Sequence, residues 1–493
     1  MTSKEAGAWP LLYAALLATL AFTPFEKPAA ASLDVGAARQ LFIDERFVSN
    51  SKGVRLSVHR PRITGERLLV PDRPWEDYWI GGYTTVIQDQ ERIHMWYEVA
   101  SKRDRDGSTG VAYAYSTDGG ATWVKPELGV VDFAGSSRNN LVLTGIHGMH
   151  VALNRPDAPA GERYLLFAGK PNRAYVSPDG IRWTPSGKAP FLDPVMNERL
   201  TLDSQNVIFW DTRLGRYVAY PRFNIPTTRG TGGIARQFGR AESKVFGDFG
   251  KFQIVFVADE SDPVDFDWYT TAALQYPYAA EAYFMFPAAY HHTPPPPKND
   301  GPLDIQFACS RDGVRWLRPD RRPIISLGFD GAWNGGSLYA GYGLSRRANE
   351  LSLYYTAYDV THGGYAKRDN LGGVITRALY RLDGFMSAEA GYEGGEFTTP
   401  LLTFSGDRLE LNLDGSAGGW CRVELRDRKG RPIPGFTEKE ADSATGNSVT
   451  RVVTWRGRRD LTALRGNPVA LRFVLRDANL YAFRFPPASD QIR

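Results

Sequence analysis

The sequence predicts an all-β protein, a five-bladed β-propeller with Asp-box turns followed by a C-terminal β-sandwich. Three observations support this. The 493 residues combine 50 glycines and 32 prolines with 42% hydrophobic and 13% aromatic residues, as expected for many strands joined by tight turns. A short turn motif recurs at regular spacing. The apolar runs between its copies have strand-like rather than helical periodicity.

Residues 1–31 are predicted to be a signal peptide. Lys4 precedes an apolar run over residues 9–22, and the small residues 29–31 provide a cleavage site. The alternatives are an uncleaved membrane anchor or a misassigned start. We expect a secreted or periplasmic protein with no membrane span once the signal is removed.

The repeated motif defines the blades. Ser116-Thr-Asp-Gly-Gly-Ala-Thr-Trp123 matches the Asp-box pattern, and shorter copies occupy 177–183 and 310–316. Degenerate candidates at 243–249 and 381–385 complete a series spaced by about 61 to 71 residues. Five such units suit four-stranded blades and predict a propeller over residues 38–394. Aspartate, glycine and tryptophan in these motifs are expected to stabilise turns and blade contacts, not to catalyse.

Strand signals agree with this spacing in each unit. Paired apolar runs, several of them separated by polar turns, occur once per predicted blade, at residues 83–88 and 93–99, 148–153 and 163–167, 206–210 and 217–220, 268–274 and 282–286, and 337–339 and 350–355.

A second β-domain is predicted over residues 395–488. Alternating runs such as 408–413, 421–425 and 469–475 are separated by turns, which indicates a sandwich. This part of the sequence has no convergent polar site, so we interpret it as a packing or accessory domain.

Composition excludes several function classes. Lys+Arg 59 against Asp+Glu 55 gives a net charge of +4, too balanced for a nucleic-acid binder that relies on a basic surface. The two cysteines offer no disulfide framework or zinc cluster, and we expect neither a transition-metal site nor a cofactor. The sequence contains no nucleotide-binding or serine-hydrolase motif. The abundant carboxylate, arginine and aromatic side chains fit a carbohydrate partner, and the balanced charge favours a neutral or mixed-charge glycan.

Propeller topology ranks the carboxylates. The innermost strand of each blade begins on the face where the pocket opens, so residues at these strand starts are the better candidates. Asp203 is the first choice, with a strand-start cap or a buried structural aspartate as its alternative. The other catalytic candidates are Asp77, Glu76 and Asp267, which could instead be surface charges.

The same topology selects substrate-binding candidates. Side chains expected on the pocket face, which could stack on sugar rings or bind hydroxyl groups, are Trp79, Tyr83, Arg222, His291, His292 and His362. The alternative for the loop histidines is a solvated or structural role.

Seven segments carry a resemblance to a known group: 41–46, 95–97, 203–206, 286–292, 310–316, 381–385 and 478–483. Through them the protein resembles the five-bladed propeller glycosidase superfamily, and within it secreted bacterial proteins similar to glycoside hydrolase family 32. The resemblance spans residues 38–486 and implies a propeller followed by a sandwich. The Asn-Asp-Pro-Asn, Arg-Asp-Pro and Glu-Cys motifs of family 32 do not occur, which implies another sugar or a lost activity.

The leading hypothesis is an exported glycoside hydrolase-like enzyme acting on a poly- or oligosaccharide by a two-carboxylate mechanism. Asp203 would be the general acid, and Asp77 or Glu76 the nucleophile or base. The alternatives are a non-catalytic carbohydrate-binding or envelope protein on the same scaffold and a sialidase-like hydrolase.

Overall fold

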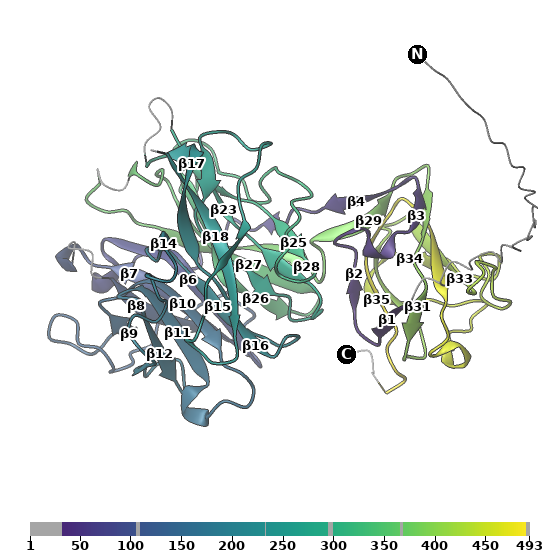
Figure 1. Ribbon diagram of the computed structural model, residues 1–493, viewed down its shortest axis with the longest axis horizontal. Coiled ribbons are helices and arrows are strands. Elements are labelled where there is room, and N and C mark those ends of the chain that lie inside the picture. Colours follow the sequence, from purple (N-terminus) through teal and green to yellow (C-terminus); the bar gives the residue numbers. More distant parts are fainter. Residues whose placement is uncertain (1–31, 105–108, 232, 294–298, 365–367, 490–493) are drawn as a thin grey trace, which may run out of the picture.

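A computed structural model describes residues 32–104, 109–231, 233–293, 299–364 and 368–489, so the predicted signal peptide lies outside the described residues. The described residues form two β-domains, a larger propeller on the left of Figure 1 and a smaller sandwich on the right, which confirms the all-β prediction. Their helical segments are short 3₁₀ turns, η1 (Glu45–Phe47), η2 (Pro74–Glu76), η3 (Lys102–Asp104), η4 (Ala160–Glu162) and η6 (Thr462–Leu464). Within these ranges, no helix is both long and apolar enough to cross a membrane.

Blades one and two are regular antiparallel sheets. Blade one contains β6 (Trp79–Asp89), β7 (Arg92–Ala100), β8 (Gly110–Ser116) and β9 (Leu141–Thr144). Blade two contains β10 (His147–Leu153), β11 (Tyr164–Lys170), β12 (Arg173–Ser177) and β13 (Thr184–Ser186).

Blade three carries an extension. Its blade strands are β15 (Val207–Asp211), β16 (Arg216–Tyr220), β18 (Ile234–Ser243) and β19 (Gln253–Phe256). The first part of β18 pairs instead with β17 (Arg222–Thr231), which also pairs with β14 (Leu200–Thr201). This β17–β18 hairpin rises at the top of the propeller in Figure 1.

Blade four is divided into two small sheets. One contains β20 (Phe266–Trp268), β23 (Ala288–His291) and β24 (Leu303–Ile305); the other contains β21 (Leu274–Gln275), β22 (Tyr283–Met285) and β25 (Ala308–Ser310). Pro287 lies at the break in the middle strand, where it lacks an N–H to donate to the ladder.

Blade five closes the ring. It contains β26 (Ser337–Arg347), β27 (Glu350–Tyr358) and β28 (Val374–Arg381), and its outer strand is β5 (Arg62–Ile63) from near the start of the described residues. Segments far apart in the sequence therefore share one blade, which holds the propeller closed.

The five repeated segments each follow the third strand of their blade, as their spacing predicts. In the first, Asp118 Oδ1 accepts hydrogen bonds from the N–H groups of Ala121 and Thr122, and Trp123 packs edge-on against Tyr354 of blade five. Asp179 and Asp312 accept equivalent backbone bonds.

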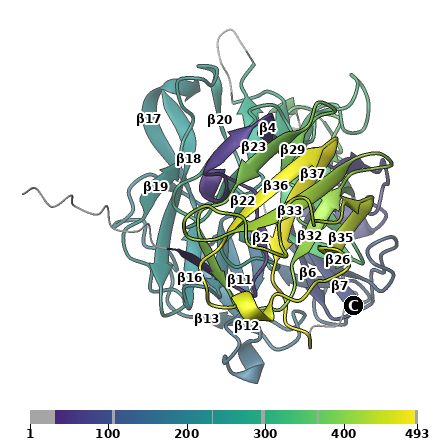
Figure 2. The same cartoon turned by 90° about the vertical axis from the view of Figure 1, so that its right-hand side faces the viewer.

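The sandwich includes both ends of the described residues. One sheet has β35 (Asn447–Val452), β32 (Glu410–Asp414), β37 (Ala478–Arg484), β29 (Met386–Ala390), β4 (Val54–Val58) and β2 (Gln40–Leu41); the other has β3 (Asn50–Lys52), β30 (Gly395–Thr398), β36 (Ala470–Arg476), β33 (Trp420–Arg426) and β34 (Ala444–Thr445). β1 (Leu33–Gly36) pairs with β31 (Leu402–Phe404). Figure 2, viewed from the sandwich side, places β36, β37 and β33 in front of the propeller.

The predicted domain boundaries at residues 38 and 395 are therefore wrong. Residues 33–58 and β29 belong to the sandwich, because β4 pairs with β29 and Phe42 and Phe47 pack into the sandwich core. Short extended segments near one end of a protein do not reveal which sheet they join.

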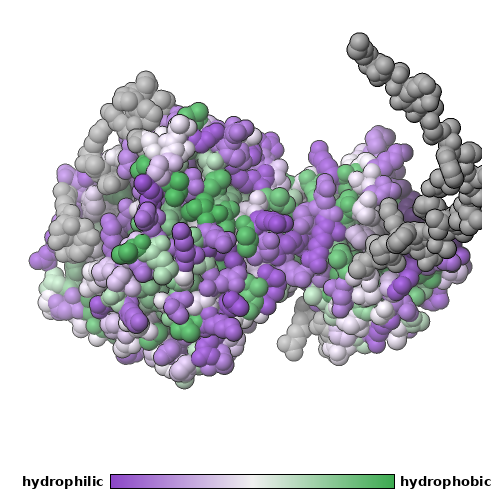
Figure 3. All heavy atoms as spheres, viewed as in Figure 1, coloured by the Kyte–Doolittle hydropathy of each residue, from purple (hydrophilic) through white to green (hydrophobic). Residues whose placement is uncertain are grey.

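Polar contacts join the two domains. The Arg39 guanidinium lies 2.6 Å from Asp383, which also accepts a hydrogen bond from the Tyr276 hydroxyl, and Arg311 lies 2.9 Å from Asp44. Figure 3 shows hydrophilic side chains covering the surface of this junction.

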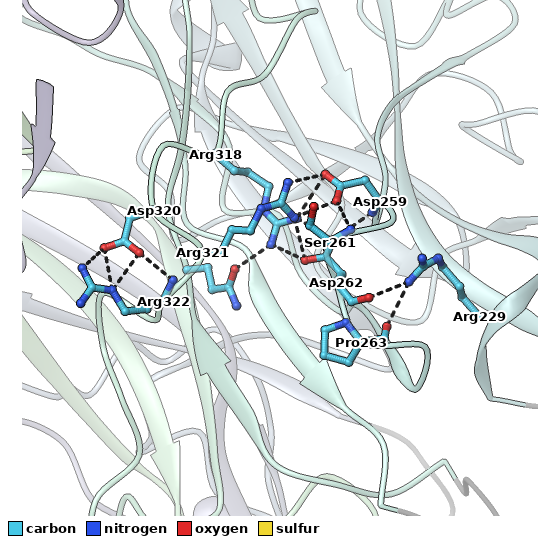
Figure 4. Close-up of polar contacts among 10 residues, drawn as sticks. Arg229, Asp259, Ser261, Asp262, Pro263, Arg318, Asp320, Arg321 and Arg322 are labelled. Carbon is cyan, nitrogen blue, oxygen red and sulfur yellow. Dashed lines mark hydrogen bonds and ion pairs between the residues drawn. The ribbon is translucent and has the colours of Figure 1, made fainter.

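A buried ion-pair network fixes the loop after β19 against blade four (Figure 4). Arg318 forms two hydrogen bonds to Asp262, at 2.6 and 2.8 Å, and lies over the Trp268 ring. Arg321 forms two bonds to Asp259, at 2.8 and 2.6 Å, and one to Asp262 at 3.1 Å.

Asp262→Ala is expected to lower the free energy of unfolding by about 3–5 kcal/mol, because it leaves the guanidinium of Arg318, only 7% exposed, without its bidentate partner. Urea denaturation followed by tryptophan fluorescence measures this. Arg322→Ala is the control: it removes an ion pair to Asp320 in which Arg322 is 73% exposed, and should cost no more than about 1 kcal/mol. Equal losses in the two variants would contradict the argument.

Candidate functional site

A cavity of about 540 Å³ opens on the propeller face where the innermost strands begin. Tyr83 near the start of β6, His147 at the start of β10, Tyr269 just after β20 and Ser337 at the start of β26 all line it. This agrees with the topological rule used to rank candidates from the sequence. A cavity of this size is within the range of small-molecule sites.

Aromatic side chains form much of the wall. The members are Tyr78, Trp79, Tyr83, Tyr269, Tyr339 and Tyr358. Hydrogen bonds hold several of them in place: the Tyr83 hydroxyl donates to the Asp203 carbonyl at 3.0 Å, and the Tyr339 hydroxyl lies 2.8 Å from Nδ1 of His362. Fixed aromatic faces of this kind suit sugar rings.

Asp203 lies in this pocket with its side chain 42% exposed. One carboxylate oxygen contacts the Arg222 guanidinium. Burial by itself would raise the pKa of the carboxyl, but the charges of Arg222 and Lys170 outweigh burial and hold the pKa below its usual range. Asp203 is therefore ionised at neutral pH. The general-acid role predicted for it does not fit, because a general acid must carry a proton.

His147 faces the same pocket and is oriented from behind. Its Nδ1 lies 3.1 Å from Oε2 of Glu98, a fully buried side chain whose Oε1 accepts a hydrogen bond from the Met149 N–H at 2.7 Å. Burial would lower the pKa of His147, but attraction to Glu98 outweighs it and raises the pKa. With Nδ1 turned toward Glu98, Nε2 is the nitrogen left for a ligand.

Three cations complete the lining. Arg222 is 3% exposed and lies over the Tyr269 ring; Arg236, from the β17–β18 hairpin, bonds Asp267 and Asn299; Lys170 ends β11. Among the described residues that line the cavity, Asp203 is the single carboxylate.

His362 also lines the cavity, but as a neutral group. Burial, reinforced by the charges of Arg236 and Arg222, lowers its pKa to about 3. It can exchange hydrogen bonds with a ligand or with Tyr339, but it carries no charge near neutral pH.

Five predicted site residues are not among the residues lining the cavity. Glu76 is fully buried and bonds Tyr97 and Lys125, and Asp77 caps the Lys102 N–H at 2.7 Å. Asp267 is buried between Arg236 and His292, whose Nε2 lies 3.3 Å from it, and His291 lies 3.3 Å from Asp304. These side chains turn toward partners elsewhere in the fold, so the predicted pair of facing carboxylates is wrong for this cavity.

The sequence-based ranking brought together Asp203, Trp79, Tyr83, Arg222 and His362 but missed His147, Glu98, Lys170 and Arg236. His147 was within reach of the strand-start rule, since it is the first residue of β10. Glu98 and Arg236 carried no such signal, because each lies within a strand. In the described part of the protein, no group of three or more His, Cys, Asp or Glu side chains is placed to hold a metal ion.

Comparison with known proteins gives no family assignment. No family model matches the sequence, and no curated protein matches it. Solved structures that it resembles include a complex of BT0996 with RGII, 17% identical, with 65% of the present protein and 92% of the other covered and a TM-score of 0.46. A thermostable family-43 glycoside hydrolase is 15% identical over 67% and 96% of the two proteins, with a TM-score of 0.43.

A third similar structure is a family 43 arabinoxylan arabinofuranohydrolase from Bacillus subtilis with cellotetraose. It is 12% identical, with 84% of the present protein and 97% of the other covered and a TM-score of 0.41. Membership of family 32 stays a prediction, and function is argued below from the pocket itself.

Proposed function

We propose that the protein is an exported glycoside hydrolase-like enzyme that cleaves a glycosidic bond in the propeller pocket. One observation carries the proposal: an ionised carboxylate, Asp203, and a histidine backed by a carboxylate, His147 with Glu98, open on the same aromatic-lined cavity. Export rests on the apolar N-terminal run of the sequence.

The two groups divide the work of glycoside cleavage. Imidazolium Nε2 of His147 gives its proton to the glycosidic oxygen as the bond from that oxygen to the anomeric carbon breaks. Asp203 provides negative charge to the oxocarbenium-like transition state, and water supplies the hydroxyl group of the new reducing end and a proton that restores His147. Whether Asp203 first bonds to the anomeric carbon is decided by retention or inversion in the first-formed product.

The pair is matched in protonation state. Asp203 is held ionised by its cationic neighbours, whereas Glu98 favours the protonated form of His147. Two groups whose environments push their pKa values apart can act as base and acid at one pH. This replaces the two-carboxylate mechanism, since the other predicted carboxylates lie elsewhere.

Two alternatives give way for different reasons. A sialidase-like site needs an arginine triad, and the described lining residues contain two arginines, Arg222 and Arg236. A non-catalytic carbohydrate binder would need the aromatic wall but neither the His147–Glu98 pair nor an ionised carboxylate beside it.

A glycan panel with detection of released reducing ends tests the proposal. Wild-type protein is expected to release sugar from at least one glycan, and His147→Gln to slow that release by about 10²–10⁴-fold through loss of the proton donor. Ligand binding is measured in parallel. A glycan that binds without being cleaved by the wild type would favour the binder, and an unchanged rate in His147→Gln would remove His147 as the acid.

A further inference from the structure

Arg222 has more hydrogen-bond donors than partners. Its side chain is 3% exposed, and one Nη contacts Asp203, but Nε and the other Nη are buried with no hydrogen-bond partner in the described residues. An unpartnered buried guanidinium donor is costly, and native structures normally satisfy such groups with protein, water or a ligand. Because Arg222 lines the cavity, a ligand can reach these donors.

Arg236 repeats this pattern on the neighbouring wall. It bonds Asp267 at 3.0 Å and Asn299 at 2.5 Å, which holds the guanidinium over the rings of Tyr269 and Tyr290. Its Nε also has no partner in the part of the protein that the structure describes. The charge of Asp267 is fully buried behind Arg236, so the cation is what the cavity presents.

Lys170 is the third cation. It is exposed at the end of β11, and no ion pair or hydrogen bond of its ammonium group occurs within the described residues. Its charge nonetheless acts on Asp203 and His147, so it lies close to both. The cavity therefore presents three cations against one carboxylate that already contacts Arg222.

We propose that the sugar bound in this pocket carries an anionic group, a carboxylate or a sulfate ester, that is held by Arg222, Arg236 and Lys170. Planar guanidinium groups bind such oxyanions through two parallel hydrogen bonds, and an ammonium group adds a point charge. The inference rests on the proposed function only in taking the occupant to be a sugar.

An anionic sugar also resolves a conflict in the pocket. Three cations would oppose the positive charge that develops at the anomeric carbon during cleavage, and Asp203 is partly neutralised by Arg222. A substrate anion that takes up the free donors of Arg222 and the charge of Lys170 leaves the carboxylate of Asp203 to face the reacting carbon.

The test compares pairs of sugars that differ in one group. Oligosaccharides of glucuronic acid and glucose, of galacturonic acid and galactose, and a sulfated galactoside are titrated into the intact protein in a calorimeter. At least one anionic sugar is expected to bind about tenfold or more tightly than its neutral partner, and the tighter of the uronate and sulfate arms identifies the source of the anion. Equal affinity across all pairs would overturn the inference.

Lys170 supplies the variants, because its replacement leaves no buried charge unpaired. Lys170→Gln is expected to raise Kd for the anionic sugar about tenfold and leave Kd for the neutral sugar unchanged, and Lys170→Arg to restore binding. Lys429→Gln, which removes an equal charge from the sandwich, should change neither. A Lys170→Gln variant that binds the anionic sugar like wild type overturns the role of Lys170.

Failure of this inference is distinguishable from failure of the proposed function. Hydrolysis of a neutral glycan that depends on His147, with no preference for anionic sugars, would overturn the anion site alone. Tight binding of an anionic sugar that is not hydrolysed, or is cleaved to an unsaturated product by elimination, would support the anion site and overturn the hydrolase.

Discussion

Asp203→Asn is expected to lower kcat by about 10³-fold while leaving the affinity for the substrate within a few-fold of wild type. Asparagine has nearly the same shape but no charge, so the negative charge beside the anomeric carbon is lost and the polar contacts of the pocket remain. Single-turnover assays measure cleavage directly, and calorimetry measures binding to the same variant.

The control for Asp203→Asn is Asp77→Asn. Asp77 was also a catalytic candidate from the sequence, but its carboxylate caps the Lys102 N–H and is not among the lining residues. Asp77→Asn should leave kcat within about twofold of wild type. An unchanged kcat in Asp203→Asn, with the fold intact by circular dichroism, would remove Asp203 from the chemistry.

Glu98→Gln is expected to shift the pH dependence of kcat/KM. The reaction needs protonated His147, so activity is present below the pKa of His147 and lost as pH rises through it. Glu98 raises that pKa; with glutamine in its place, the alkaline limb should move down by about one pH unit. The acid limb, which reports Asp203 with its pKa below 3.8, should stay where it is.

Other charged groups near His147 decide how this profile is interpreted. Lys170 lowers the pKa of His147 and Asp203 raises it, so both residues are kept as wild type in the experiment. Glu76→Gln is the matched control, because it also removes a buried carboxylate from blade one but one bonded to Tyr97 and Lys125. Both variants are expected to lose stability, and Glu98→Gln alone should move the alkaline limb. An unmoved limb would contradict the role of Glu98.

The pocket also corrects an expectation drawn from composition. A net charge of +4 over 493 residues favoured a neutral or mixed-charge glycan. Net charge averages over the whole surface, whereas a ligand responds to the few charges that face its cavity. Because the carboxylates of Glu98 and Asp267 are turned into the protein behind His147 and Arg236, the cavity presents mostly cations.

The strand-start rule succeeded where backbone topology alone decides position. Asp203, Tyr83 and Trp79 lie before or near the start of innermost strands, and every propeller blade places such residues on one face. The rule failed for Asp77 and Glu76 because the 3₁₀ turn η2 and its hydrogen bonds direct these side chains away from the cavity lining. Position along a strand predicts the face; the partners of a side chain decide where it points.

The sequence by itself determined the blade repeat, the all-β class and the second β-domain, because turn chemistry and apolar periodicity are local properties of a polypeptide. Only the tertiary structure decided that residues 33–58 pair with the sandwich, that β5 closes blade five, and that His147, Glu98, Lys170 and Arg236 join Asp203. Those outcomes depend on contacts between segments far apart in the sequence, and on burial and charge acting over a few ångströms, which neither composition nor spacing encodes.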